Sequence, residues 1–271
     1  MVVVRKEIGR TREYVSAIGL GTWSIRDYGK AKTVFLEGIR SGIDNVDTAE
    51  MYDSGRAEVF VGEVLREVGK ENVFVTTKML PVHLVSREEV VRAARNSLKR
   101  LGLSEVDLFL IHWPNPSIPI SMQIRNFEAL VDEGLARYIG VSNFYPHELE
   151  EAITATRKTD IVVDQVHYSV YHRYPVEDGL DVICSKHGIT IQAYNVIERG
   201  RVARDNILAT VASKYNKTPV QIAINYAISN PRVIALVKTE NESHLREILG
   251  SMGWGLAEHD MEFIRRMISA D

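Results

Sequence analysis

Four side chains that could carry acid–base chemistry stand at regular intervals in the sequence. Asp47, Lys78 and His112 each follow a short apolar segment, and Tyr52 comes five residues after Asp47. Asp47 and Lys78 are 31 residues apart, and Lys78 and His112 are 34 apart. Each interval fits one strand plus one helix, which together need roughly 30 residues. Because parallel-sheet proteins place their chemistry at the carboxyl ends of strands, we predict that the four side chains meet at one rim.

The four side chains together suit proton transfer to or from an oxygen atom. A tyrosine is a weak acid, with an unperturbed pKa of about 10. An ammonium group about 4 Å away is worth roughly 4 kcal/mol at an effective dielectric constant of about 20, so Lys78 is expected to bring the pKa of Tyr52 near the working range. Asp47 would keep Lys78 charged, and His112 could donate a hydrogen bond to a substrate oxygen.

Such a site could protonate a carbonyl oxygen while the carbonyl carbon gains a hydride, or run the reverse reaction. Side chains of these types have no redox chemistry of their own. The site therefore implies a hydride-carrying cofactor.

Strand and helix patterns alternate along the rest of the chain. The segments 2–8 and 14–18 read as a β-hairpin, because turn residues separate them. Eight strands are predicted after it, at 18–23, 43–46, 73–77, 106–111, 137–141, 161–166, 189–193 and 233–237. No linker rich in Pro, Gly or Ser divides them, so we predict one closed barrel domain spanning residues 1–271.

Helix start signals lie between several of the predicted strands. Ser86 with Glu89 forms a capping-box pattern, and Gly102 ends the apolar stripe that follows. Thr218 and Gln221 form the same pattern before another helix, and residues 258–269 also read as helical.

An open, doubly wound sheet is the rival architecture for a nicotinamide enzyme. Its glycine fingerprint is missing, because serine stands at position 24 where the third glycine belongs in Gly-Leu-Gly-Thr-Trp-Ser. The sequence has no phosphate-loop or His-Glu-x-x-His pattern. His167 and His172 are five residues apart and off helical register, so no metal site is predicted.

Composition narrows the class of protein. The chain has 271 residues, a formal net charge of −3 and one cysteine, Cys184. Lysine and arginine are scattered, which argues against a nucleic-acid or membrane partner. A single cysteine allows no intrachain disulfide, and no run of about 18 apolar residues occurs. We expect a soluble cytoplasmic protein.

The motifs around the four residues resemble those of the aldo-keto reductases. They are Asp47-Thr-Ala-x-x-Tyr52, Lys78, His112-Trp-Pro and Gly140-Val-Ser-Asn-Phe144, and the resemblance covers essentially the whole chain. It implies a (β/α)8 TIM barrel with an N-terminal β-hairpin, and NADPH, with NADH possible, at the carboxyl rim. It also implies a catalytic tetrad of Asp47, Tyr52, Lys78 and His112, with Tyr52 as general acid.

The same resemblance assigns further residues to the cofactor and the substrate. Ser142, Asn143 and Gln165 match contacts of the nicotinamide carboxamide, and Tyr194 matches the aromatic residue under the nicotinamide ring. Other matches are Thr22 near the cofactor, Lys238, Thr239, His244 and Glu247 around the adenosine 2′-phosphate and adenine, and Trp23 and Trp113 on the substrate pocket.

Several positions depart from the family pattern. Residues 195–200 read Asn-Val-Ile-Glu-Arg-Gly where the family often has Ser-Pro-Leu, and Ile248 replaces a common Asn. His244 stands in place of the arginine that usually holds the 2′-phosphate. A bidentate, always charged group is thereby lost, so we expect a real but modest preference for NADPH over NADH.

We therefore predict an enzyme that reversibly reduces a small aldehyde or ketone to an alcohol. One alternative is a Schiff-base lyase that uses Lys78 as nucleophile, although Asp47 would keep that amine protonated. A second alternative is a cofactor-binding regulatory partner subunit with little turnover. The segments that shape the pocket rim are short, which predicts a permissive substrate mouth.

Overall fold

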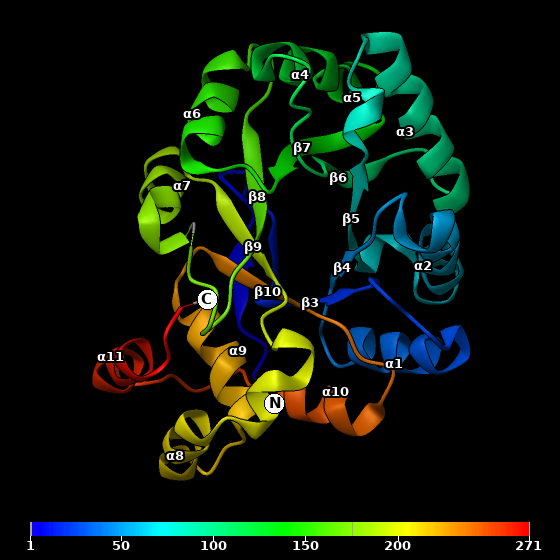
Figure 1. The fold of residues 1–271 in the computed structure, drawn as a ribbon. Helices are drawn as coiled ribbons and strands as arrows, with labels where there is room; N and C mark the ends of the chain where they lie inside the picture. Colours follow the sequence, from blue (N-terminus) through cyan, green and yellow to red (C-terminus); the bar gives the residue numbers. More distant parts are fainter. Residues whose placement is uncertain (1, 175, 271) are drawn as a thin grey trace.

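The computed structural model describes residues 2–174 and 176–270 and contains a closed barrel of eight parallel strands (Figure 1). Each strand pairs with the next along the chain, and the last pairs with the first. The strands are β3 (Ile18–Gly21), β4 (Asn45–Asp47), β5 (Phe74–Met79), β6 (Val106–Ile111), β7 (Ala136–Ser142), β8 (Ile161–His167), β9 (Thr190–Tyr194) and β10 (Val233–Val237). The predicted (β/α)8 barrel is confirmed.

Helices surround the barrel in Figure 1. They are α1 (Tyr28–Arg40), α2 (Arg56–Val68), α3 (Arg87–Leu101), α4 (Ile120–Phe127), α5 (Ala129–Asp132), α6 (Pro146–Ala155), α7 (Asp181–His187), α8 (Asn206–Tyr215), α9 (Pro219–Ser229), α10 (Glu242–Leu249) and α11 (Glu258–Met267). Shorter helical turns are η1 (Tyr52–Gly55), η2 (Lys70–Asn72), η3 (Pro81–His83), η4 (Val176–Leu180) and η5 (Glu198–Arg204). In the part of the chain that the structure describes, no helix is both long and apolar enough to span a membrane.

The predicted helix caps at Ser86, Gly102 and Thr218 are present, but of the two predicted capping boxes only the one at Thr218 is complete, and the Glu89 side chain bonds to His83 and Arg92 instead. The Ser86 hydroxyl accepts a hydrogen bond from the Glu89 amide at 3.2 Å, and Gly102 ends α3 with a left-handed φ of 70°. The Thr218 hydroxyl accepts from the Gln221 amide at 3.2 Å, and the Gln221 side chain accepts in return from the Thr218 amide at 3.1 Å. These reciprocal bonds satisfy amide groups that a helix start leaves unpaired.

The N-terminal hairpin closes the barrel at the amino ends of the strands. It pairs β1 (Arg5–Glu7) with β2 (Tyr14–Ser16) and is shorter than predicted, because Ile18 already pairs with Ala235 of β10. Ile8 and Val15 from the hairpin are buried with residues of the barrel interior, namely Phe74, Leu108, Leu110, Val162, Val163 and Ile234. The opposite, carboxyl end is left to the polar residues that follow the strands.

Candidate active site

A buried ion pair lies where β4 and β5 end. Lys78 Nζ donates hydrogen bonds to both carboxylate oxygens of Asp47 at 2.7 Å each and to the carbonyl oxygen of Thr48 at 2.8 Å. Lys78 is fully buried, which by itself would lower its pKa, but Asp47 and Tyr52 outweigh the burial and raise the pKa above its ordinary value. Lys78 is therefore an ammonium group at any working pH.

Tyr52 is held against this ion pair by the tight turn η1. Asp53 and Ser54 adopt left-handed backbone angles, with φ of 47° and 52°, directly after it. The Lys78 ammonium lies 4.8 Å from the centroid of the Tyr52 ring, and the His112 ring meets Tyr52 edge-on at 5.7 Å between centroids. The four side chains that the sequence placed at one rim do meet there.

The acidity of Tyr52 differs from the sequence-based expectation. Burial raises the pKa of Tyr52 above its ordinary value, Lys78 opposes the rise and Asp47 adds to it. The expectation that Lys78 brings this pKa near the working range is therefore wrong for the protein alone. The reason is physical: a phenolate loses its hydration in this site, and the charge of Lys78 is already compensated by Asp47.

His112 is neutral. Burial first, and the charge of Lys78 second, lower the pKa of His112 to about 3. Its Nδ1 atom is buried and makes no hydrogen bond with any residue of the described ranges. A neutral imidazole keeps one N–H that can donate to a ligand.

A second polar group adjoins the tetrad along β7, β8 and β9. Asn143 Nδ2 donates to the His112 carbonyl at 2.9 Å, and Asn143 Oδ1 accepts from the Tyr194 hydroxyl at 2.8 Å. Asn143 has a left-handed φ of 59°, which turns its side chain back toward these partners. The Ser142 hydroxyl donates to the backbone carbonyl oxygen of Gln165 at 2.8 Å. The residues that the resemblance assigned to the nicotinamide thus lie together, beside the tetrad.

Gln165 connects this second group to the ion pair. Its Nε2 atom donates to Asp47 Oδ1 at 2.8 Å and to Gln192 Oε1 at 2.9 Å. Gln192 is fully buried and was not among the residues predicted for the site. The signal for it was its position two residues before Tyr194, which places both side chains on the same face of β9.

The two histidines considered as metal ligands support Tyr194 instead. The His167 ring stacks on Tyr194 with 5.5 Å between centroids, and His172 stacks on His167 at 4.0 Å. Glu198 of η5 lies 2.7 Å from His167 Nε2. Within the described ranges, no group of three or more potential metal ligands occurs.

The expected pocket and cofactor residues that follow β3 and β6 differ in exposure. Trp23 is 51% exposed with its ring 5.0 Å from that of Tyr52, and Trp113 is 36% exposed with its ring 4.7 Å from that of His112. Both tryptophans therefore flank the tetrad. Thr22 is buried, and its hydroxyl donates to the Asp47 carbonyl at 3.1 Å, which fixes β3 to β4.

The segment that follows β10 carries the expected 2′-phosphate residues. Lys238 forms an ion pair with Glu240, and Thr239 is buried with its hydroxyl accepting from the Asn241 amide at 3.1 Å. His244 is exposed on the first turn of α10, and Glu247 is half-buried one turn later. No motif in the sequence points to Glu240.

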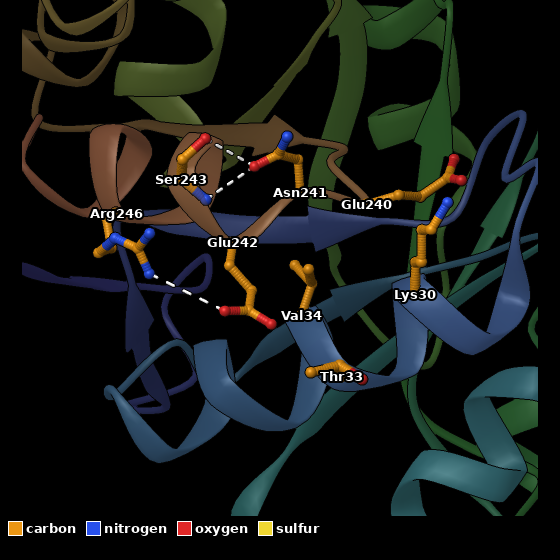
Figure 2. Close-up of a pocket in the computed structure, with 8 residues that line it drawn as sticks. All are labelled: Lys30, Thr33, Val34, Glu240, Asn241, Glu242, Ser243 and Arg246. Atoms are coloured by element: carbon orange, nitrogen blue, oxygen red, sulfur yellow. Dashed lines mark hydrogen bonds and ion pairs between the residues drawn. The ribbon is translucent and has the colours of Figure 1, made fainter.

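A hollow of about 400 Å³ lies between α1 and the start of α10 (Figure 2). It is lined by Lys30, Thr33, Val34, Glu240, Asn241, Glu242, Ser243 and Arg246. None of the tetrad residues contributes to it, so the hollow is not the place of the proton chemistry.

Known proteins match this chain over nearly its whole length. The model of the aldo/keto reductase family matches residues 17–269. Methylglyoxal reductase DkgB from Salmonella typhimurium is 32% identical over 244 residues, which cover 87% of this chain and 86% of the relative.

Two solved structures share the fold closely. A thermostable aldo-keto reductase in complex with the inhibitor epalrestat has a TM-score of 0.91 and 37% identity, and the match covers 97% of this chain and 99% of the other. An aldo-keto reductase from Klebsiella pneumoniae in complex with NADPH also has a TM-score of 0.91, with 28% identity and coverage of 100% and 97%. The chain belongs to the aldo/keto reductase family.

Proposed function

We propose that this protein reduces a small aldehyde or ketone to an alcohol with NADPH, and that Tyr52 gives the proton to the carbonyl oxygen. Membership of the family makes the chain an NADP-dependent oxidoreductase. The roles of individual residues are our proposal. The observation that carries it is the buried Lys78–Asp47 ion pair beside Tyr52 and a neutral His112.

The polar residues at the rim suit a nicotinamide. The side-chain nitrogen atom of Gln165, Nε2, donates to Asp47 and Gln192, and its side-chain oxygen atom, Oε1, accepts no hydrogen bond from the residues described here. That oxygen is suited to a carboxamide N–H, together with the polar atoms of Ser142 and Asn143. Tyr194 offers a flat ring that His167 supports by stacking. Bound NADPH would supply the hydride.

The four residues of the tetrad have different roles in the proposed proton transfer. Because burial raises the pKa of Tyr52, the phenol keeps its proton until a substrate oxygen beside it gains negative charge. The Lys78 ammonium then stabilises the phenolate that forms, and Asp47 keeps Lys78 charged. Neutral His112 can donate a hydrogen bond to the same substrate oxygen and orient it.

The side chains at the rim support a small carbonyl compound as the substrate. Two partly exposed tryptophans, Trp23 and Trp113, flank Tyr52 and His112 and offer apolar walls to a small carbonyl compound. The relative DkgB is named a methylglyoxal reductase, so methylglyoxal is a sensible first substrate to test.

The experiment is to follow NADPH oxidation with methylglyoxal, simple aldehydes, sugars and ketones, and with NADH in parallel. We expect turnover with at least one aldehyde. If the protein binds NADPH tightly but turns over none of these compounds, the regulatory-subunit alternative replaces the proposal.

The Schiff-base alternative is disfavoured by the contacts of Lys78. Both oxygens of Asp47 accept from its ammonium group, whose pKa is raised, so the free amine that a Schiff base needs is scarce. Borohydride treatment with an aldehyde substrate tests this directly. A covalent adduct on Lys78 that depends on the substrate would overturn our assignment.

A further inference from the structure

Glu240 is fixed beside Lys238 by several contacts. It forms an ion pair with Lys238, and its carboxylate accepts the backbone amides of Arg26 and Asp27 at 3.0 and 2.9 Å. Partial burial alone would raise the pKa of Glu240, but Lys238 and the two amides lower it below its ordinary value. The carboxylate is therefore ionised, and it cannot turn away without losing its bonds to the segment between β3 and α1.

The formal charges of residues 238–246 cancel, with His244 counted as neutral. Lys238 and Arg246 are positive, whereas Glu240 and Glu242 are negative, and Glu242 lies 4.0 Å from Arg246. Figure 2 shows Glu240, Glu242 and Arg246 around the hollow between α1 and α10. An anion that approaches Lys238 thus meets a lysine whose charge is already compensated.

We infer that Glu240 is a specificity-determining residue that narrows the preference of this enzyme for NADPH over NADH. The inference rests on the proposed function with NADPH, and on the family resemblance, which implies that Lys238 faces the adenosine 2′-phosphate. A 2′-phosphate carries a charge of about −1.5 to −2 and must share Lys238 with the fixed carboxylate, which repels it. NADH has a hydroxyl group at that position, and a carboxylate accepts a hydrogen bond from a ribose hydroxyl well.

The test is to measure the dissociation constants of NADPH and NADH by quenching of intrinsic tryptophan fluorescence in wild type and Glu240→Gln. Glutamine keeps a similar shape and one acceptor oxygen but removes the negative charge. We expect NADPH to bind about fivefold tighter in the variant and NADH to change less than about twofold. Loosening of the β3–α1 segment would weaken the binding of both cofactors alike. The ratio of the NADH dissociation constant to the NADPH dissociation constant therefore reports the effect of the Glu240 charge alone.

Glu242→Gln is the matched control, because it removes one negative charge from the same segment at an exposed position. We expect it to leave the ratio of the two constants unchanged within about twofold. An equal rise of the ratio in both variants would contradict the inference, since the segment's net charge, and not Glu240, would then set the preference.

Lys238→Met separates this inference from the proposed function. If Lys238 faces the 2′-phosphate, the substitution weakens NADPH and spares NADH. An unchanged ratio in Lys238→Met would mean that the cofactor placement itself is wrong. A lowered ratio in Lys238→Met together with an unchanged ratio in Glu240→Gln would overturn the role of Glu240 alone.

Discussion

At the scale of single residues, the site depends on one fully buried ammonium group and the partners that compensate it. Lys78 bonds to both oxygens of Asp47, and Gln165 bonds to one of them from the other side of the barrel. A buried charge without a partner is strongly disfavoured, so each of these contacts also serves stability. A substitution of Lys78 is therefore expected to lower both activity and stability, and an experiment has to distinguish the two effects.

Lys78→Met should lower kcat at least about 100-fold, because Tyr52 loses the charge that stabilises its phenolate. It should also lower the free energy of unfolding by about 3–5 kcal/mol, since Asp47 is left buried and unpaired. The double variant Lys78→Met/Asp47→Asn should regain much of that stability but no activity. Recovery of activity along with stability would mean that Lys78 serves only the fold.

His112 gives a pH dependence of stability whose sign is defined. Its pKa is lowered to about 3 in the folded protein, whereas an unfolded histidine has a pKa of about 6.5. The unfolded chain therefore binds more protons as the pH falls below 6.5, and stability present above that pH is lost. From pH 7 to pH 5 the loss is about 2 kcal/mol for this group.

Denaturant unfolding of wild type and His112→Gln at pH 7 and pH 5 measures this contribution. The variant should lose less stability over the interval than wild type, by about 2 kcal/mol. Equal losses in the two proteins would show that His112 takes up a proton in the folded state.

For single residues, the sequence predicted the positions of the site residues well but predicted their acidity poorly. Spacing at strand ends predicted the meeting of Asp47, Tyr52, Lys78 and His112, because the repeat length of a barrel unit is regular. The direction of the Tyr52 pKa shift was wrong, because the depth of burial is not visible in spacing.

At the scale of elements, β7 and β8 approach each other closely through Gly140. A Cβ atom at Gly140 would lie 2.6 Å from the Val163 carbonyl oxygen and 2.7 Å from the Leu110 side chain. The pairing register of the two strands shifts between Ile139 and Val141, at the same place. Gly140 therefore sets the spacing of the strands that carry Ser142 and Gln165.

Gly140→Ala should lower the free energy of unfolding by about 1–3 kcal/mol and weaken NADPH binding, because the added methyl group pushes β7 away from β8. Gly21→Ala is the matched control in another strand, since its nearest neighbour would lie at 3.7 Å. The control should change stability by less than about 1 kcal/mol. Denaturant titration of both variants measures the two losses of stability. Equal losses would mean that the close approach of β7 and β8 at Gly140 does not cause the destabilisation.

Element positions were largely predictable, whereas contacts between distant elements were not. The eight strands and the caps at Ser86 and Thr218 follow from local patterns of apolar and capping residues. Gln192 meets Gln165 only through strand register, and Glu240 meets the amides of Arg26 and Asp27 only through loop docking. No local pattern in the sequence carries that information.

At the scale of the whole molecule, closure of the barrel assembles the site from most of the chain. Asp47 and Gln165 are 118 residues apart in sequence and hydrogen-bonded in space. The hairpin closes the amino end with apolar side chains, so the polar groups at the carboxyl end form the face at which we propose that cofactor and substrate bind. On this face lies Tyr52, which we propose as the proton donor.

The most direct test is a comparison of wild type with Tyr52→Phe for NADPH binding and for turnover of an accepted aldehyde. Phenylalanine keeps the ring that packs against Lys78, His112 and Trp23 but removes the hydroxyl group. We expect an NADPH dissociation constant within about twofold of wild type and a kcat at least about 100-fold lower. A kcat above about a tenth of the wild-type value, with NADPH binding intact, would contradict Tyr52 as the proton donor.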